Sequence, residues 1–184
     1  MYTLPKIERF NQDVLSKYHI YNSVFITLPF DSIDNTGVLL PLFTETCETG
    51  FKKQETPKEI FDWMREQGMR WHTMDEIWQR GFQAVMRDAV NEALESAESL
   101  YISIDVDSLD PSFAPGTGTP EPGGIMSADL LRMVRTLCLE HNVVGIDIVE
   151  VAPAYDVSDL TVNVAHRLAF ECMAGLAARR RNQQ

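Results

Sequence analysis

The sequence predicts an α/β fold built on a parallel sheet, and three observations support that prediction. Two short apolar runs, residues 100–104 and 143–149, have the length and the β-branched content of buried strands. Segments with apolar residues at helical spacing lie before, between and after these runs. Carboxylates follow each run directly, where the sites of parallel sheets lie. Helices that alternate with apolar strands indicate βαβ units.

The N-terminal part, residues 1–57, is predicted to be a helical segment. Apolar residues at helical spacing favour a first helix over residues 5–26. The apolar run that follows the next turn favours a second helix over residues 38–50. A third helix is predicted to start with Thr56 as its N-cap and Pro57 in its first turn.

The part from residue 58 onward is predicted to begin with a helix, a short strand and a second helix. A helix over residues 60–68 ends in glycine, and a short strand is predicted over residues 69–73. Thr73 and Glu76 have the spacing of a capping box, which predicts the start of one long helix running to about Leu94.

Two more helices flank the second apolar run. Ser127 is predicted to cap a helix that buries apolar residues as far as Cys138. The last helix is predicted over residues 158–179, because arginines at its end suit the negative end of a helix dipole. No internal repeat is evident.

Composition excludes several classes of partner. The 184 residues carry a formal net charge of -11, which disfavours nucleic acid and anionic membranes as partners. No apolar run approaches the roughly 18 residues of a membrane span. The N-terminal sequence lacks the apolar core of a signal peptide, so a cytoplasmic protein is expected. The three cysteines are far apart and are interpreted as reduced packing residues.

The candidate site follows the first apolar run. Asp105 and Asp107 are two residues apart, so an extended backbone would point both to one face. Asp110 and a loop rich in proline and glycine follow, over residues 111–124. Paired carboxylates favour a hard divalent ion such as Mn, Mg or Ca. The alternative is an acidic surface loop with turn-forming aspartates.

Two blocks of sequence resemble a known family. Residues 103–120, SIDVDSLDPSFAPGTGTP, and residues 145–156, GIDIVEVAPAYD, resemble the signatures of the ureohydrolases, which include arginases, agmatinases and guanidinobutyrases. The ending PAYD is more similar to the agmatinase and guanidinase branch. The resemblance covers about residues 60–184. It implies the C-terminal half of an arginase-like domain, with three α/β/α layers around a parallel sheet.

The resemblance also implies roles for particular residues. Asp105 and Asp107 correspond to ligands of manganese, of which the family uses two ions. Glu150 corresponds to the carboxylate that holds the guanidinium of a small substrate. The reaction implied is hydrolysis of a linear amidine, in which a manganese-activated hydroxide attacks the guanidinium carbon and urea is released.

Three further residues receive supporting roles. Asp110 is expected to shape the loop, whereas Thr117 and Thr119 are expected either to shape it or to orient the metal ligands. The four histidines are expected to be structural or surface residues, because none has the paired spacing of metal ligands.

The family's N-terminal metal-binding motifs are missing from the sequence, which has neither a GGDH block nor a DAHxD block. Activity is therefore an open question, and two alternatives remain beside an incomplete hydrolase. One is an inactive fragment or fusion product that retains only the fold. The other is a half-enzyme that another chain completes. Members of the family form trimers and hexamers, which makes a homo-oligomer plausible.

The N-terminal segment has a resemblance of its own. Residues 1–57 are similar to the N-terminus of a bacterial phosphoenolpyruvate carboxylase, without any of the catalytic motifs of that enzyme. The chain is therefore divided into a segment outside the ureohydrolase family, 1–57, and a partial ureohydrolase domain, 58–184. A fused or recombined gene would explain the junction near residues 56–62.

Overall fold

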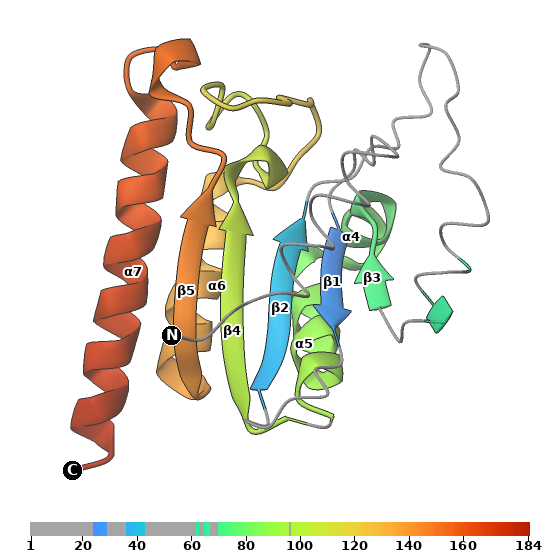
Figure 1. Ribbon diagram of the computed structural model, residues 1–184, viewed down its shortest axis with the longest axis vertical. Coiled ribbons are helices and arrows are strands. Elements are labelled where there is room, and N and C mark those ends of the chain that lie inside the picture. Colours follow the sequence, from blue (N-terminus) through green and yellow to red (C-terminus); the bar gives the residue numbers. More distant parts are fainter. Residues whose placement is uncertain (1–23, 29–35, 43–61, 63–64, 67–69, 96) are drawn as a thin grey trace.

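A computed structural model describes the chain over residues 24–28, 36–42, 62, 65–66, 70–95 and 97–184 (Figure 1). The strands of the described residues are β1 (Val24–Leu28), β2 (Thr36–Leu42), β3 (Arg70–His72), β4 (Ser99–Asp105) and β5 (Val143–Val149). They form one sheet in the order β3-β1-β2-β4-β5. Strands β2, β4 and β5 are parallel, whereas β1 is antiparallel to both of its neighbours.

The helices of the described residues that carry the fold are α4 (Met74–Arg80), α5 (Phe82–Ala93), α6 (Ser127–Glu140) and α7 (Leu160–Asn182). In Figure 1, α5 and α6 lie behind the sheet and α7 runs alongside β5. The predicted α/β class is confirmed. The second helical layer of the three-layer prediction is not among the described residues. Neither α7 nor any other helix in that part of the chain has the length and hydropathy to span a membrane.

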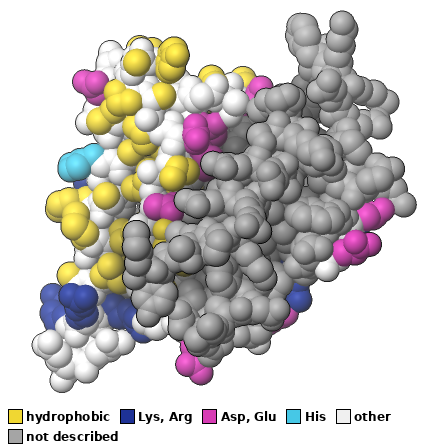
Figure 2. Space-filling view, viewed as in Figure 1, with side chains coloured by type: hydrophobic (Ala, Val, Ile, Leu, Met, Phe, Trp, Pro, Cys, Tyr) yellow, Lys and Arg dark blue, Asp and Glu magenta, His cyan; other side chains and the backbone are white. Residues whose placement is uncertain are grey.

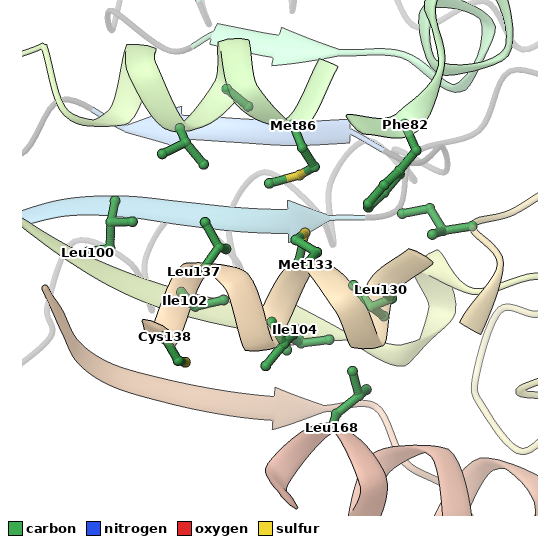
Figure 3. Close-up of a cluster of buried hydrophobic side chains, with 14 of the residues drawn as sticks. Phe82, Met86, Leu100, Ile102, Ile104, Leu130, Met133, Leu137, Cys138 and Leu168 are labelled. Atoms are coloured by element: carbon green, nitrogen blue, oxygen red, sulfur yellow. The ribbon is translucent and has the colours of Figure 1, made fainter. Parts of the chain in front are cut away.

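The core lies between the sheet and helices α5 and α6. Alternate residues of β4, namely Leu100, Ile102 and Ile104, are fully buried on that face, as the two-residue period of a strand requires. Figure 3 shows these side chains facing others from α5, α6 and α7, among them Phe82, Met86, Leu130, Met133, Leu137 and Leu168. Burial of this surface fixes which face of β4 is inward.

The long helix predicted from Thr73 to Leu94 is broken in two. Gly81 has φ +85°, a left-handed value that the helix interior does not permit, and it separates α4 from α5. The predicted start is confirmed, because the Glu76 N–H donates to Thr73 Oγ1 at 3.2 Å. The second bond of the capping box is replaced, since the Glu76 carboxylate pairs with His72 and Arg80.

Four other predicted elements agree with the structure to within a few residues. β3 and β5 lie where short strands were predicted, and α6 begins at Ser127. Met126 occupies the N-cap position, so the prediction that Ser127 caps this helix is wrong by one residue. α7 begins at Leu160 and not at Ser158, because Ser158 and the next residue have positive φ values.

The helices predicted in the N-terminal part are wrong wherever the structure describes that part. Residues 24–26 belong to β1 and residues 38–42 belong to β2. Short apolar runs do not distinguish a buried helix from a strand, and here pairing decides: β2 lies parallel to β4, with Thr36 opposite Ser99. The remainder of these two helices and the start of the third lie outside the described residues. The division of the chain at residue 57 stays a prediction.

Candidate functional site

The candidate site lies at the carboxyl ends of β4 and β5, which are neighbours in the sheet. Asp105 is the last residue of β4 and lies opposite Val149, and Glu150 follows immediately. The parallel register thus brings two segments 45 residues apart to one end of the sheet, below the loops at the top of Figure 1.

The backbone turns at the end of β4. Residues Val106–Ser108 form a 3₁₀ turn, and Asp105 Oδ1 accepts a hydrogen bond from the Asp107 N–H at 2.9 Å. The expectation that an extended backbone places both carboxylates on one face is therefore wrong. The two groups are brought together by this turn, because Asp105 caps it with its own side chain.

Asp107 is a buried carboxyl group with one oxygen that lacks a hydrogen-bond partner among the described residues. Its side chain is only 4% exposed. Thr119 donates to Oδ2 from its backbone N–H at 3.2 Å and from its hydroxyl, whereas Oδ1 has no hydrogen-bond partner among the described residues. Burial and the nearby charge of Glu150 raise the pKa of Asp107. The hydrogen bonds from Thr119 lower this pKa, but their effect is smaller.

The three carboxylates act on one another as a single cluster. Burial, together with the charges of Asp107 and Glu150, raises the pKa of Asp105 to about 7, although the bond from the Asp107 N–H acts in the opposite direction. This acidic cluster, defined as Asp105, Asp107 and Glu150, gathers three carboxylates at one end of the sheet, of which Asp107 is buried and Asp105 is half-buried. A cation placed among these groups would relieve both the burial cost and the repulsion.

Glu150 is held in an uncommon backbone conformation. It has φ +64°, which non-glycine residues rarely adopt. Its carbonyl accepts from Thr117 Oγ1 at 3.0 Å, and Thr117 is buried. A Cβ on Gly118 would lie 3.5 Å from Glu150 Oε2, so the carboxylate extends over this glycine. The loop after β4 therefore meets Glu150 at two places: Thr117 bonds its backbone carbonyl, and Gly118 lies beside its carboxylate.

The Asp110 side chain forms its hydrogen bonds within the loop. Its carboxylate accepts from the N–H of Ser112 at 2.9 Å and from the N–H of Gly123 at 2.8 Å. These bonds close the loop across a stretch in which Ile125 also pairs with Leu109. They outweigh the effect of burial and hold the pKa of Asp110 below its usual value.

The start of α7 is tied to the same loop by residues that sequence reasoning did not select. The Gly116 N–H donates to Thr161 Oγ1 at 2.7 Å, and the Thr161 hydroxyl donates to Asp156 Oδ1 at 2.8 Å. The Ala152 N–H completes the tie by donating to the Gly116 carbonyl at 2.8 Å. The Asp156 carboxylate also accepts from the N–H groups of Thr161 and Val162 at 3.1 Å each, so it caps the start of α7 from outside the N-cap position.

The histidines lie elsewhere. His72 is buried, with Nδ1 2.9 Å from Glu76 Oε2 and Nε2 3.3 Å from Glu92 Oε2. His141 ends α6, and His166 is exposed on α7. The fourth, His19, lies outside the described residues.

The donor chemistry of the acidic cluster fits a hard divalent cation, since carboxylate oxygens suit Mn or Mg and one of them is buried without a partner. The described part of the chain contains no group of three or more His, Cys, Asp or Glu residues arranged to hold a metal. A complete two-ion centre therefore does not fit the described residues by themselves.

Comparisons with known proteins point to one family. A sequence model of the arginase family matches residues 24–175. The chain is 35% identical to human mitochondrial guanidino acid hydrolase over 129 residues, which cover 70% of this chain and 36% of that protein. It is 40% identical to an agmatinase of Bacillus anthracis over 121 residues, 64% of this chain and 38% of that protein.

A solved structure shows the same likeness. Formimidoylglutamase of Bacillus subtilis superposes with a TM-score of 0.62 and 29% identity, over 68% of this chain and 39% of that one. The chain thus spans well under half the length of each of these proteins. The family match begins at residue 24, inside the segment expected to lie outside the family, and the resemblance of that segment to a phosphoenolpyruvate carboxylase stays a prediction.

Proposed function

The chain belongs to the arginase family, and from that premise we propose that it carries the acidic part of a ureohydrolase site in the agmatinase-like branch. The proposed reaction is hydrolysis of a linear amidine, such as agmatine or guanidinobutyrate, with release of urea. Asp105 and Asp107 would bind manganese, and Glu150 would bind the guanidinium of the substrate.

One observation carries this proposal: Asp107 Oδ1 is buried and has no hydrogen-bond partner among the described residues. A buried carboxylate oxygen without a partner is costly, and such oxygens are commonly explained by an ion or a function. Bound manganese would supply Lewis acidity that lowers the pKa of water. Thr119 would keep the other oxygen of Asp107 fixed, so that Oδ1 stays directed at the ion.

The proposed role of Glu150 rests on its position and its charge. A carboxylate offers two oxygens to a planar guanidinium, which donates two parallel hydrogen bonds. The bond from Thr117 to the Glu150 carbonyl fixes the backbone from which this side chain starts. Proximity to the other carboxylates would place a bound guanidinium carbon next to the metal-binding residues.

We also propose that the site is incomplete in this chain, because the described residues provide two metal-binding carboxylates and no third ligand. The same observation favours the second candidate function, an inactive fragment or fusion product that retains the fold. A homo-oligomer, a trimer or hexamer, remains part of the proposal, as does a cytoplasmic location.

The first test is manganese binding, measured by electron paramagnetic resonance on purified protein. We expect binding in the wild type that is weakened at least about tenfold in Asp107→Asn. Asp75→Asn, which alters an exposed carboxylate on α4, is the matched control and should bind as the wild type does. Equal binding in all three proteins would contradict the role of Asp107.

The second test is urea release from agmatine, guanidinobutyrate and guanidine in the presence of manganese. The incomplete site predicts weak or no turnover, whereas sustained urea release would show that other residues or a partner supply the missing ligands. Thr119→Val should weaken manganese binding, and Thr117→Val should weaken guanidinium binding with manganese affinity unchanged. A pair of variants with identical effects would contradict this division of roles.

The proposed fusion at residues 56–62 is tested at the source gene. Sequencing across this junction should show the joined reading frame. An unbroken frame for a full-length ureohydrolase at that locus would contradict the fusion and would leave the family membership unchanged.

A further inference from the structure

Two cysteines that are 34 residues apart in the sequence meet in the core between α6 and α7. Cys138 Sγ and Cys172 Sγ are 3.4 Å apart, and both residues are buried. Cys138 is labelled among the buried side chains of Figure 3. We propose that this pair is an oxidation site that closes to a disulfide and fixes α7 against α6.

The contact between the two helices is close at this place. A Cβ on Gly175 would lie 2.7 Å from Cys138 Cβ and 2.7 Å from the Arg135 carbonyl oxygen, so the backbone of α7 approaches α6 directly. Gly175 follows Cys172 by three residues and therefore lies on the same face of α7. The absence of a side chain at Gly175 brings the sulfur of Cys172 within reach of α6.

A polar contact fixes the register of the helices on the neighbouring turn. Glu171, directly before Cys172, is buried and pairs with Arg135 of α6. It also pairs with Arg167 of its own helix at 2.7 Å. The ion pair and the glycine contact together hold the two sulfurs opposite each other. Closure requires the sulfurs to approach from 3.4 Å to the S–S bond length of about 2.05 Å.

The surroundings explain why the pair would remain reduced without an oxidant. Burial raises the pKa of the Cys138 thiol to about 12, and the hydrogen bond with Cys172 contributes to this rise. Few thiolates are therefore present near neutral pH, and closure is slow. A small neutral oxidant such as hydrogen peroxide is the class of reagent that reaches a buried thiol.

The reaction with peroxide balances in two steps. One thiolate attacks a peroxide oxygen, the O–O bond breaks, hydroxide leaves, and a sulfenic acid forms. The second sulfur attacks that sulfenic sulfur, the S–S bond forms and the S–O bond breaks with loss of water. Both thiol protons end in water, and the peroxide receives the two electrons that the sulfurs lose.

The bond would affect the loop over residues 111–124, called the acidic loop below, as well as the helices. The Thr161 hydroxyl near the start of α7 accepts from the Gly116 N–H, so α7 is one of the supports of the loop that holds Glu150. A covalent link between α6 and α7 reduces the freedom of this support in partly unfolded states. This consequence does not depend on the proposed hydrolase activity.

The test is oxidation of the reduced full-length protein by hydrogen peroxide, followed by alkylation and non-reducing peptide mapping. We expect a peptide pair linked through Cys138 and Cys172, and an intact mass lower by two hydrogens. The melting temperature should rise by about 5–10 °C and should return on reduction with dithiothreitol. Cys47→Ser should behave as the wild type does, whereas Cys138→Ser and Cys172→Ser should lose the temperature shift.

Three results would overturn the proposal. The first is recovery of both cysteines as alkylated or sulfinic peptides after oxidation of the wild type. The second is a link from either cysteine to Cys47. The third is the expected link without any rise in melting temperature. The first two are read from the wild type alone, so they hold even if a variant fails to fold.

Discussion

At the scale of single residues, the acidic cluster stores unfavourable free energy in the metal-free protein. Asp107 is buried, and one of its oxygens has no hydrogen-bond partner in the described part of the chain. The pKa of Asp105 is raised to about 7 by burial and by the charge of Asp107. Such perturbed groups indicate a functional site more strongly when several share one place, as they do here. The same perturbation makes folding stability depend on pH.

We predict that the metal-free protein loses stability as pH rises from about 4 to about 7. In this window folded Asp105 keeps a proton that the unfolded chain has already released, so the unfolded state becomes relatively more favourable. The pKa shift corresponds to a loss of roughly 4 kcal/mol as an upper limit. Urea unfolding in the presence of a chelator measures this slope. Asp105→Asn should flatten it, and Asp75→Asn should leave it unchanged.

A second prediction concerns the two glycines of the acidic loop. A Cβ on Gly116 would lie 2.5 Å from Asp156 Cβ, whereas one on Gly118 would make an ordinary contact of 3.5 Å with Glu150 Oε2. Gly116→Ala should therefore lower the free energy of unfolding by about 2–4 kcal/mol, because the backbone beside α7 must move. Gly118→Ala should change it by less than about 1 kcal/mol. Thermal unfolding of both variants tests this difference.

At the scale of elements, the contact between α6 and α7 fixes the position of α7, whose first turn binds the loop over residues 111–124 through Thr161. α7 presents Leu168, Cys172 and Gly175 to the core, and Glu171 lies among them although it is charged. Burial acts to raise the pKa of Glu171, but hydrogen bonds from Arg167 and Arg135 outweigh it and lower this pKa. A paired buried carboxylate thus fixes one helix against the other.

We predict that Glu171→Gln lowers the free energy of unfolding by about 1–3 kcal/mol at neutral pH. Because the folded pKa of Glu171 is lowered, its contribution is complete above the ordinary glutamate pKa and is lost as pH falls below it. The difference between wild type and variant should therefore shrink in acid. Glu140→Gln, at the exposed end of α6, should be neutral throughout. A difference that grew in acid would contradict this explanation.

At the scale of the whole molecule, β5 ends the sheet within the described residues, although its sequence VVGIDIV is typical of a strand with neighbours on both sides. Val144 is 58% exposed. Figure 2 shows hydrophobic side chains gathered on the part of the surface formed by β5 and α7. An apolar edge strand of this kind is a site for unwanted pairing between chains.

We predict that Val144→Lys reduces aggregation of the purified protein, because a charge on an edge strand opposes pairing with another strand. Val157→Lys is the matched control, since Val157 is equally exposed at 58% but lies in the segment before α7. Static light scattering during storage should show a clear reduction for the first variant only. Similar reductions for both would mean that net charge, and not the β5 edge, controls the aggregation.

Much of the fold was predictable because local patterns reflect burial directly. The two apolar runs became β4 and β5, and the helices predicted from Ser127 and Ser158 became α6 and α7, the second of which starts at Leu160. The positions of β1 and β2 were not predictable, because their short apolar runs gain their structure from pairing with distant strands. The break at Gly81 was not predicted either, because apolar residues at helical spacing continue across it from Ile77 in α4 to Phe82 in α5.

The sequence by itself determined the family and the identity of the acidic residues, because both depend on the order of residues in two continuous blocks. Only the tertiary structure decided how these residues meet. The parallel pairing of β4 with β5 places Glu150 beside Asp105, and the 3₁₀ turn leaves one oxygen of Asp107 buried and without a partner among the residues that the structure describes. The tertiary structure also decided that Cys138 and Cys172 lie in contact, because the packing of one helix on another is not encoded in any local pattern.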